Sequence, residues 1–450
     1  MFDLFLFPYI IKYILYLSWL FDFLVLPSYS PAPQPLTRRL QVSELSYTGK
    51  VHWWRTAWIL ALAGVPAFGD TAAVLPFWNS APTPSQASLD WLGESIAETV
   101  AEALGSRGIL TLERPDIQDA FHRLGLRQRS ALSQASVMKI GEELDAEEVV
   151  YGTFEFTPAA NAVGSGAKGS LKISGHILDL KRLRAGPEFA ETGSIEDLAT
   201  LQAHLAWRTL DLLAPKLAPP ESEFRALRQP VRLDAEEIYV RGLLAVDPEQ
   251  KEKFFLQAAR LDPRFVHPCY QLGQIHYQRK EYRQAADWLQ KVTPDDIHYR
   301  EASFLLGLAL FQSGDFAGAQ KAFQMIVAAV PLSEVYNDLG ASESRRNLPQ
   351  AIDDFRKAIE GDPADPVYQF NLGYALFKKG DFAAAFEHFH AVVERDPADT
   401  LAASLLARCE KKQGLKPSVD GRLANLERLK TNYEERAYWQ LKAMLEPKQP

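Results

Sequence analysis

Residues 306–331 read LGLALFQSGDFAGAQKAFQMIVAAVP, and residues 372–397 read LGYALFKKGDFAAAFEHFHAVVERDP. Each stretch has a glycine near its start, an alanine and a phenylalanine in its middle and a proline at its end. The Leu-Gly pair recurs at intervals of 34, 33 and 33 residues, with its glycine at Gly273, Gly307, Gly340 and Gly373. A fixed period of this length is typical of solenoids built from paired helices.

The recurring residues have a packing role. Glycine and alanine let two antiparallel helices approach closely, an aromatic side chain fills the joint, and proline ends the second helix. The recurring residues are Ala319, Phe323, Ile326 and Pro331, then Ala351, Phe355, Ala358 and Pro363, then Ala385, Phe389, Val392 and Pro397.

These repeats resemble the tetratricopeptide repeat (TPR) family, which implies an all-α TPR solenoid over residues 231–414. Residues 242–263 and 273–294 are interpreted as shortened repeats with a clipped turn or second helix. Residues 401–414 are predicted to add one more first helix. The remainder, 415–450, is predicted to be a C-terminal capping helix and tail, with the cap over 420–445.

The resemblance also implies a concave groove lined by the first helix of each pair. The groove positions lie three residues before the repeat glycine and one and four residues after it. They are Tyr270, Gln274, Tyr277, Phe304, Leu308, Phe311, Asn337, Ala341, Ser344, Phe370, Tyr374 and Phe377. We expect an apolar or extended peptide here, anchored by aromatic rings and bonded by Asn337 or Gln274. The Lys/Asn pattern that clamps a peptide carboxylate in some relatives is missing from these positions. Alternatively, the aromatic rings pack only against neighbouring repeats or the C-terminal helix.

An α/β pattern fills residues 70–216. Apolar runs and alternation predict strands over 74–78, 109–113, 148–156 and 170–180, and helical spacing predicts helices over 89–104, 116–124, 137–144 and 195–213. The last two strands enclose a Gly/Ala/Ser loop and are predicted to form a hairpin. This order of elements predicts a two-layer or three-layer domain around one sheet.

Four stretches of this region resemble the TolB N-terminal-type domain. They are AVLPF at 73–77, LDWLGESI at 89–96, LTLER at 110–114 and IGEELDAEEVVYGTF at 140–154. The resemblance implies a multidomain chain: an α/β (TolB N-terminal-like) domain, a linker over 217–230, and the TPR solenoid. That family is also similar to accessory envelope proteins of curli secretion and flagella. The β-propeller of TolB itself is absent, so no propeller or pore function is expected.

The N-terminal 69 residues are apolar in two places. Residues 4–26 are long enough for a membrane helix but contain Pro8, Lys12 and Asp22. Residues 51–69 have the basic, apolar and small-residue order of a secretory signal peptide. Two interpretations stay open: translation begins near Val51 and residues 1–50 are a gene-model extension, or residues 1–50 hold a membrane anchor. Either predicts a cell-envelope location, periplasmic or membrane-anchored, and no cysteine follows for a lipoprotein anchor.

Charge and cysteine content exclude several classes of protein. The chain has 49 Lys and Arg against 57 Asp and Glu, a net charge of −8, which disfavours nucleic acid as a partner. Its two cysteines, Cys269 and Cys409, cannot build a disulfide framework or a four-thiolate zinc site.

Short motifs give no cofactor or metal site. The G-x-G-x-x-G over 164–169 precedes a strand rather than the helix that dinucleotide binding requires, so it is interpreted as a hairpin loop. His388 and His390 would point about 200° apart on a helix, which is wrong for one metal. Asp295 and Asp296 are interpreted as helix caps. We therefore expect no catalytic residues, no metal site and no cofactor.

The sequence predicts a non-enzymatic, envelope-associated adaptor. Its TPR groove would bind protein or peptide partners, and the α/β domain would be a second docking module. One alternative is a regulatory or signalling protein whose α/β domain senses a small ligand. A second alternative, an enzyme with a dispersed active site, would require a deep polar pocket.

Overall fold

The computed structural model describes residues 71–81, 89–128, 130–159, 169–226, 231–414 and 424–434, together with 437–438, 441–442 and 445. The expected membrane anchor, the signal-like segment and most of the loop over 164–169 lie outside these residues. Within the part described, no helix combines the length and the apolar character needed to span a membrane.

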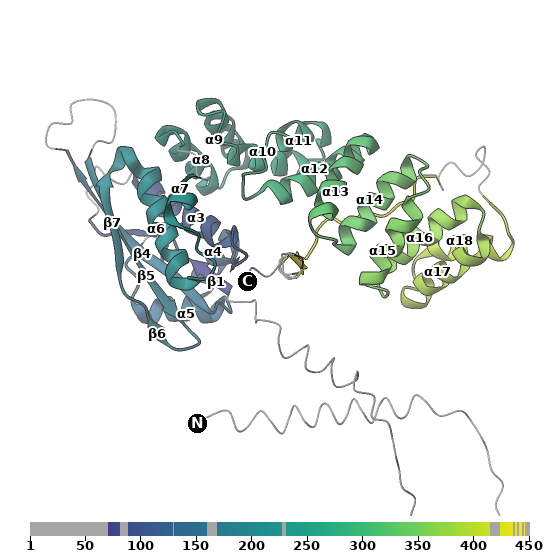
Figure 1. Ribbon diagram of the computed structural model, residues 1–450, viewed down its shortest axis with the longest axis horizontal. Helices are drawn as coiled ribbons and strands as arrows, with labels where there is room; N and C mark the ends of the chain where they lie inside the picture. Colours follow the sequence, from purple (N-terminus) through teal and green to yellow (C-terminus); the bar gives the residue numbers. More distant parts are fainter. Residues whose placement is uncertain are drawn as a thin grey trace, which may run out of the picture. The chain divides into compact units, whose positions relative to one another are not determined.

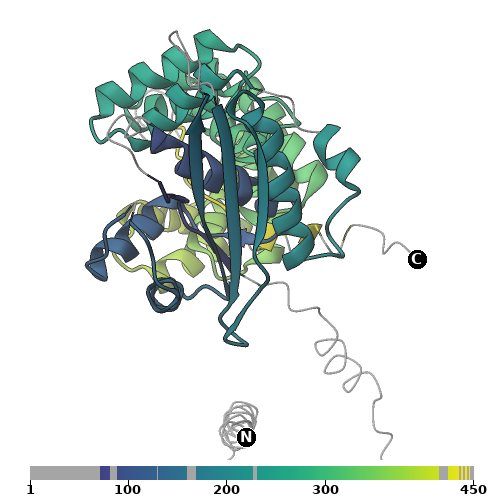
Figure 2. The ribbon, with the colours of Figure 1, turned by 90° about the vertical axis from the view of Figure 1, so that its left-hand side faces the viewer.

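A mixed sheet forms the centre of the α/β domain, and Figure 2 looks onto its strands. Its strands run in the order β3-β1-β4-β5-β6, with β2 paired to β4 and β7 paired to β5. β1 is parallel to β3 and β4, and β4 forms the predicted antiparallel hairpin with β5. The strands are β1 (Thr71–Val74), β2 (Trp78–Asn79), β3 (Leu110–Thr111), β4 (Glu148–Pro158), β5 (Gly169–Asp179), β6 (Arg184–Ala185) and β7 (Phe189–Ser194).

Helices cover both faces of the sheet, so the domain has three layers. Successive residues of β4 point to opposite faces. Val150 packs with Leu92 of α3 and Leu205 of α6, whereas Val149 packs with Phe121 of α4 and Ile140 of α5. The helices are α3 (Trp91–Gly105), α4 (Arg114–Arg123), α5 (Gln134–Glu143) and α6 (Leu198–Leu213), with a 3-10 turn over Ile195–Asp197 before α6.

Two strands differ from the sequence prediction. The single first strand expected over 74–78 is two short strands, because the chain between β1 and β2 contains Pro76, which has no N–H for a strand ladder. β7 was not predicted, since its sequence FAETGS has no run of β-forming residues. It nevertheless pairs with β5 over residues 189–194.

The second half of the chain is a series of helix pairs (Figure 1). The pairs are α8 (Leu233–Leu244) with α9 (Pro248–Leu261), α10 (His267–Gln278) with α11 (Tyr282–Leu289), α12 (Tyr299–Ser313) with α13 (Phe316–Ala329), α14 (Ser333–Arg345) with α15 (Ala351–Gly361), and α16 (Pro366–Lys379) with α17 (Phe382–Arg395), followed by α18 (Thr400–Glu410). α11 has 8 residues and is shortened as expected, whereas α9 has 14 residues and is not clipped. A short helix, α7 (Glu221–Ala226), precedes the series.

The repeat glycines lie at tight helix crossings, as their packing role predicts. A Cβ atom added at Gly307 would stand 2.6 Å from the Phe323 ring, and one at Gly340 would stand 2.9 Å from Phe355. A Cβ atom added at Gly273 would stand 2.4 Å from the Leu289 side chain. Real Cβ atoms do not approach neighbours this closely, so any larger residue would push the paired helices apart.

The first helix pair packs directly on the α/β domain. Ser95 of α3 hydrogen-bonds the buried Glu236 of α8, and Gln202 Nε2 donates to Ser95 Oγ at 2.7 Å. Arg114 Nη1 donates to the Leu243 carbonyl at 2.5 Å. One apolar core runs from the sheet through Tyr239 and on to Leu272 of α10. The α/β domain therefore covers the open end of the helical series, as terminal caps of solenoids do.

Candidate functional site

Residues 424–434, which we call the strap, lie against the first helices α12, α14 and α16 of three successive pairs. The strap contains no helix or strand. It runs opposite to the order of the repeats, because Asn425 contacts Tyr374 of α16 and Tyr433 contacts Phe304 of α12. In Figure 1 it is the thin yellow trace beside the green helices. A peptide segment of this chain therefore occupies the predicted groove.

Two asparagines hold the strap by its main chain. Asn371 Nδ2 donates to the Arg428 carbonyl at 2.6 Å, and Arg428 N–H donates to Asn371 Oδ1 at 2.8 Å. Asn337 Nδ2 donates to the same carbonyl at 3.0 Å and Asn337 Oδ1 accepts a bond from Asn371. Both asparagines are fully buried. Because these bonds use backbone groups of the strap only, they recognise an extended chain whatever its side chains.

A buried carboxyl continues this backbone recognition. Asp338 Oδ1 accepts the Lys430 N–H at 2.8 Å, and the Tyr374 hydroxyl accepts the Asn425 N–H at 3.1 Å. The bonded amides of Arg428 and Lys430 are two residues apart, as expected for an extended chain whose alternate groups point to one side.

A polar pocket binds the side chain of one strap residue, Glu427. The Glu427 carboxylate accepts hydrogen bonds from Ser344 Oγ at 2.7 Å and Arg345 Nε at 2.5 Å, and Lys378 Nζ lies 3.3 Å away. Its side chain has no exposed surface. A buried carboxylate requires such compensation, because an unpaired charge in this place would be strongly destabilising.

The basic side chains of the strap bind acidic residues at helix starts. Arg428 Nη1 lies 2.7 Å from Asp399 Oδ2 and its guanidinium stacks 3.5 Å from the Phe370 ring centroid. Lys430 pairs with Asp365. Asp365 and Asp399 are the N-cap residues of α16 and α18 and lie one repeat apart.

The strap ends in an aromatic contact. The Tyr433 ring meets Phe304 edge-on at a centroid distance of 5.1 Å. Arg300 Nε donates to the Tyr433 hydroxyl at 2.6 Å, and that hydroxyl donates to Glu301 at 3.2 Å. Four side chains of the strap thus contact different parts of the groove: Glu427, Arg428, Lys430 and Tyr433.

The predicted groove residues separate into three groups. Phe304, Asn337, Phe370 and Tyr374 contact the strap, and so does Ser344. Leu308, Phe311 and Phe377 are buried within the helix stack, and Ala341 is buried beside them. In the second pair, Tyr270 stacks on His298, Gln274 bonds the Tyr270 hydroxyl at 2.8 Å, and Tyr277 meets Tyr282 edge-on.

The prediction for the C-terminal segment needs correction. The segment 420–445 was predicted to be a capping helix, but residues 424–434 are extended because groove side chains take the backbone groups that a helix would bond internally. Asn337, Asn371 and Lys378 all bind the strap, although they do not form the pattern that clamps a peptide carboxylate. Here the lysine contacts a glutamate side chain.

Sequence reasoning missed several residues that bind the strap. Asn371 lies two residues before its repeat glycine, outside the family offsets, and Asp338, Arg345 and Lys378 were not singled out. Aligning the repeats on Pro363 and Pro397, which are 34 residues apart, would have revealed a signal. Three pairs share this separation: Asn337 and Asn371, Ser344 and Lys378, and Asp365 and Asp399.

Binding of the strap is expected to weaken as pH rises. Burial raises the pKa of the Asp338 carboxyl well above its ordinary value, although bonds from Lys430 N–H and Asn337 oppose the shift. The other titratable groups near it are Lys430, Glu334 and the hydroxyls of Tyr277 and Tyr368. An undocked, hydrated Asp338 ionises near pH 4, so docking takes up a proton. Docking is complete below the undocked pKa and is lost as pH rises through the raised pKa.

The measurement is the affinity of a peptide of residues 424–434 for a chain that ends at residue 414, between pH 5 and pH 9. Asp338→Asn keeps the Oδ1 acceptor and is expected to flatten the pH profile. A profile that is equally steep in this variant would assign the dependence to another group.

Comparison with known proteins identifies the repeats. The tetratricopeptide repeat family model matches residues 270–334 and 343–414. No curated protein matches the sequence. The chain therefore contains tetratricopeptide repeats, a class of helical module that binds peptides and proteins. The resemblance of the α/β domain to the TolB N-terminal-type domain stays a prediction.

The solved structures to which part of this chain is similar include the following three. MamA (residues 41 to the end) from Desulfovibrio magneticus RS-1 is 26% identical, with a TM-score of 0.33, over 37% of this chain and 94% of MamA. YrrB, described as a TPR protein with an unusual peptide-binding site, is 20% identical, with a TM-score of 0.36, over 38% of this chain and 91% of YrrB. A thermophilic TPR protein from Thermus thermophilus is 12% identical, with a TM-score of 0.29, over 39% of this chain and 99% of that protein.

Proposed function

We propose that this protein is a non-enzymatic adaptor whose TPR groove binds an extended segment of a partner protein in exchange for its own strap. The observation that carries the proposal is the strap itself. Asn371 bonds both main-chain groups of Arg428, and a closed polar pocket takes Glu427. A groove equipped in this way for one extended peptide can bind another of the same chemistry.

The strap indicates what a partner segment looks like. It is extended, it carries a glutamate followed directly by arginine, and it has a lysine three residues after the glutamate. The glutamate enters the pocket of Ser344, Arg345 and Lys378, while the two bases reach Asp399 and Asp365. Charged groups at fixed spacing give such a groove register and specificity.

Tethering makes the strap a strong competitor. A segment linked to its own binding site has an effective concentration in the millimolar range for short flexible linkers. A partner therefore displaces the strap only when its segment binds more tightly or when a second contact holds the partner close. We propose that the α/β domain supplies that second contact.

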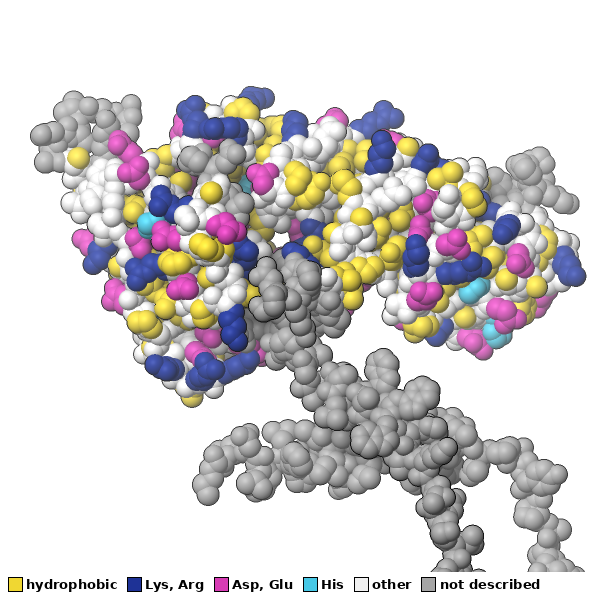
Figure 3. Space-filling view, viewed as in Figure 1, with side chains coloured by type: hydrophobic (Ala, Val, Ile, Leu, Met, Phe, Trp, Pro, Cys, Tyr) yellow, Lys and Arg dark blue, Asp and Glu magenta, His cyan; other side chains and the backbone are white. Residues whose placement is uncertain are grey.

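The envelope location remains part of the proposal. Its support is the pair of apolar segments within residues 1–69, one of them with the residue order of a signal peptide. On the face drawn in Figure 3, acidic and basic side chains are interspersed over the repeats, without a broad basic patch of the kind that binds nucleic acid.

A competition experiment tests the adaptor role. A chain that ends at residue 414 and the full chain would be immobilised and exposed to an envelope extract of the native host. We expect the shortened chain to retain proteins that an excess of the 424–434 peptide releases, while a scrambled peptide of the same composition releases none. The same shortened chain with Asn371→Ala should retain much less. Retention that neither the peptide nor Asn371→Ala affects would contradict groove binding.

A further inference from the structure

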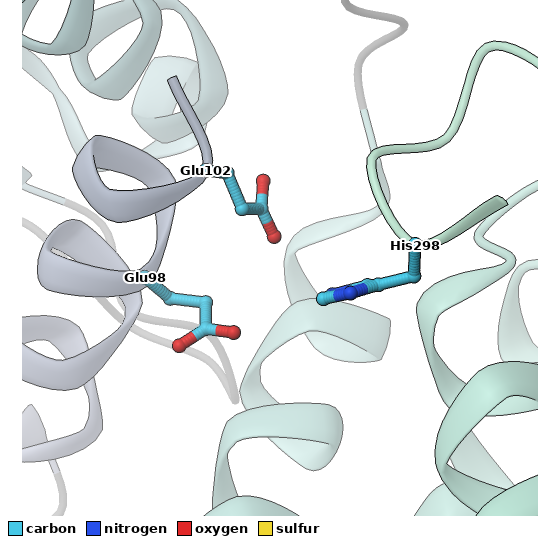
Figure 4. A group of neighbouring side chains, drawn as sticks. All are labelled: Glu98, Glu102 and His298. Atoms are coloured by element: carbon cyan, nitrogen blue, oxygen red, sulfur yellow. The ribbon is translucent and has the colours of Figure 1, made fainter. Parts of the chain in front are cut away.

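We propose that Glu98, Glu102 and His298 form a binding site for a divalent transition-metal ion between the α/β domain and the repeats. One ligand atom from each residue lies within 4.8 Å of the other two. In Figure 4 both carboxylates and the imidazole ring point toward a common space. This site is separate from the groove and does not depend on the adaptor role.

Local structure explains why these ligands meet. Glu98 and Glu102 are four residues apart on α3, so they share one face of the helix. His298 belongs to the other half of the molecule and immediately precedes α12. Its backbone N–H donates to Asp296 Oδ1 at 2.8 Å, which fixes the turn that carries the ring.

One buried nitrogen of this group, His298 Nε2, has no hydrogen-bond partner among the described residues. The ring is held in place by stacking on Tyr270, with a centroid distance of 4.5 Å. A buried polar atom without a partner is costly, and a metal ion would satisfy this one.

One of the two carboxyl groups has no cationic partner. Glu98 forms no ion pair within the described residues, whereas Glu102 pairs with His267 at 3.1 Å. Two carboxylates four residues apart on one helix face repel each other. A dication bound between them would compensate the Glu98 charge and reduce this repulsion. Glu98 also lines a small cavity with Arg114 and Gln118.

Outer residues position the ligands in the manner of known metal sites. His267 Nδ1 lies 3.1 Å from Glu102 Oε1, and its Nε2 lies 3.0 Å from Asp296 Oδ2. His267 thereby connects one ligand directly with the aspartate that holds the His298 turn. Hydrogen bonds to ligating side chains orient these side chains and support metal affinity. They come from α10 and the segment before α12, so the repeats help to shape the site.

The donor set narrows the choice of ion. Two carboxylate oxygens and one imidazole nitrogen suit Zn²⁺ or Mn²⁺, whereas Ca²⁺ and Mg²⁺ prefer oxygen donors alone. Zn²⁺ binds mixed nitrogen and oxygen sites more tightly than Mn²⁺, so Zn²⁺ is the expected occupant and water completes its coordination. An ion here would join α3 to the repeats, which gives the predicted ligand-sensing role a specific ligand.

The test uses the full chain without a histidine tag, stripped with a chelator and titrated with Zn²⁺ against a chromophoric competitor. We expect one ion per chain and a melting temperature raised by about 3 °C or more at saturation. Glu98→Gln and His298→Gln should each weaken binding by about 100-fold. Glu142→Gln, at an exposed position on α5, should not change it.

Substitution with Co²⁺ gives a second readout that does not depend on stability, because its visible d–d bands report the coordination number and geometry of the bound ion. The spectrum of the His298→Gln chain should differ from that of the unaltered chain or be absent. The proposal fails if the full chain binds no Zn²⁺, or if both variants bind it as tightly as the unaltered chain does. The three residues would then be a cluster of carboxyl and imidazole groups that share protons.

Discussion

A chain that ends at residue 414 is expected to bind a peptide of residues 424–434 about 100-fold more tightly than the full chain does. The full chain holds this segment in its own groove, so an added peptide must compete with it. If the strap is docked in about 99% of molecules, the apparent affinity for a competitor falls by that factor of about 100. The contacts of Asn371, Asp338 and the Glu427 pocket make so high an occupancy reasonable.

Fluorescence anisotropy of the labelled peptide measures both affinities. The melting curve of the shortened chain is the necessary control, because Phe304 and Phe370 lose the cover that Tyr433 and Arg428 provide. A scrambled peptide should bind neither chain. Equal affinities for the two chains would show that the strap does not occupy the groove in solution.

Replacing Glu427 by alanine is expected to release the strap from the full chain. The substitution leaves Arg345 and Lys378 facing each other in a largely enclosed pocket without their anion. Breaking one side of a buried charge cluster costs about 3 kcal/mol, or a factor of about 100 in docking. The full-length variant should therefore bind the unaltered peptide nearly as well as the shortened chain does.

Glu434→Ala is the matched control for this prediction. Glu434 lies in the same strap, but its side chain is exposed. A peptide carrying the Glu427→Ala change should also bind the shortened chain about 100-fold more weakly, whereas the Glu434→Ala peptide should bind normally. If the two substitutions had the same effect, the Glu427 pocket would not be a determinant of recognition.

The repeats could be predicted from sequence because their determinants are local and periodic. Gly307 and Phe323 belong to one helix pair, and their contact is repeated by Gly340 with Phe355 one repeat later. In the α/β domain, the alternation of β4 and β5 was sufficient to predict the hairpin.

The occupant of the groove could not be predicted in this way. The bond between Asn371 and Arg428 joins residues 57 positions apart, and no local pattern in the strap indicates this contact. Leu426 and Leu429 resemble one face of a helix, which led to the predicted cap. The asparagines that bind the main chain of the strap, Asn337 and Asn371, lie side by side only in the stacked helices.

The cluster of Glu98, Glu102 and His298 could not be predicted from sequence for a similar reason. Glu98 and Glu102 lie four residues apart on α3, which is also the ordinary spacing of acidic residues on the polar face of an amphipathic helix. His298 lies nearly two hundred residues further along the chain, and no motif connects it with them. Asp296 was predicted to cap a helix and does hold the backbone N–H of His298, but it also bonds His267.

Hydrogen exchange at the backbone amides of Arg428 and Lys430 in the full chain tests the occupied groove most directly. Both N–H groups are bonded to groove side chains, Asn371 and Asp338. We predict that both exchange far more slowly than in the free 424–434 peptide, and that Asn371→Ala removes most of this protection. Exchange at the free-peptide rate in the unaltered chain would contradict the account.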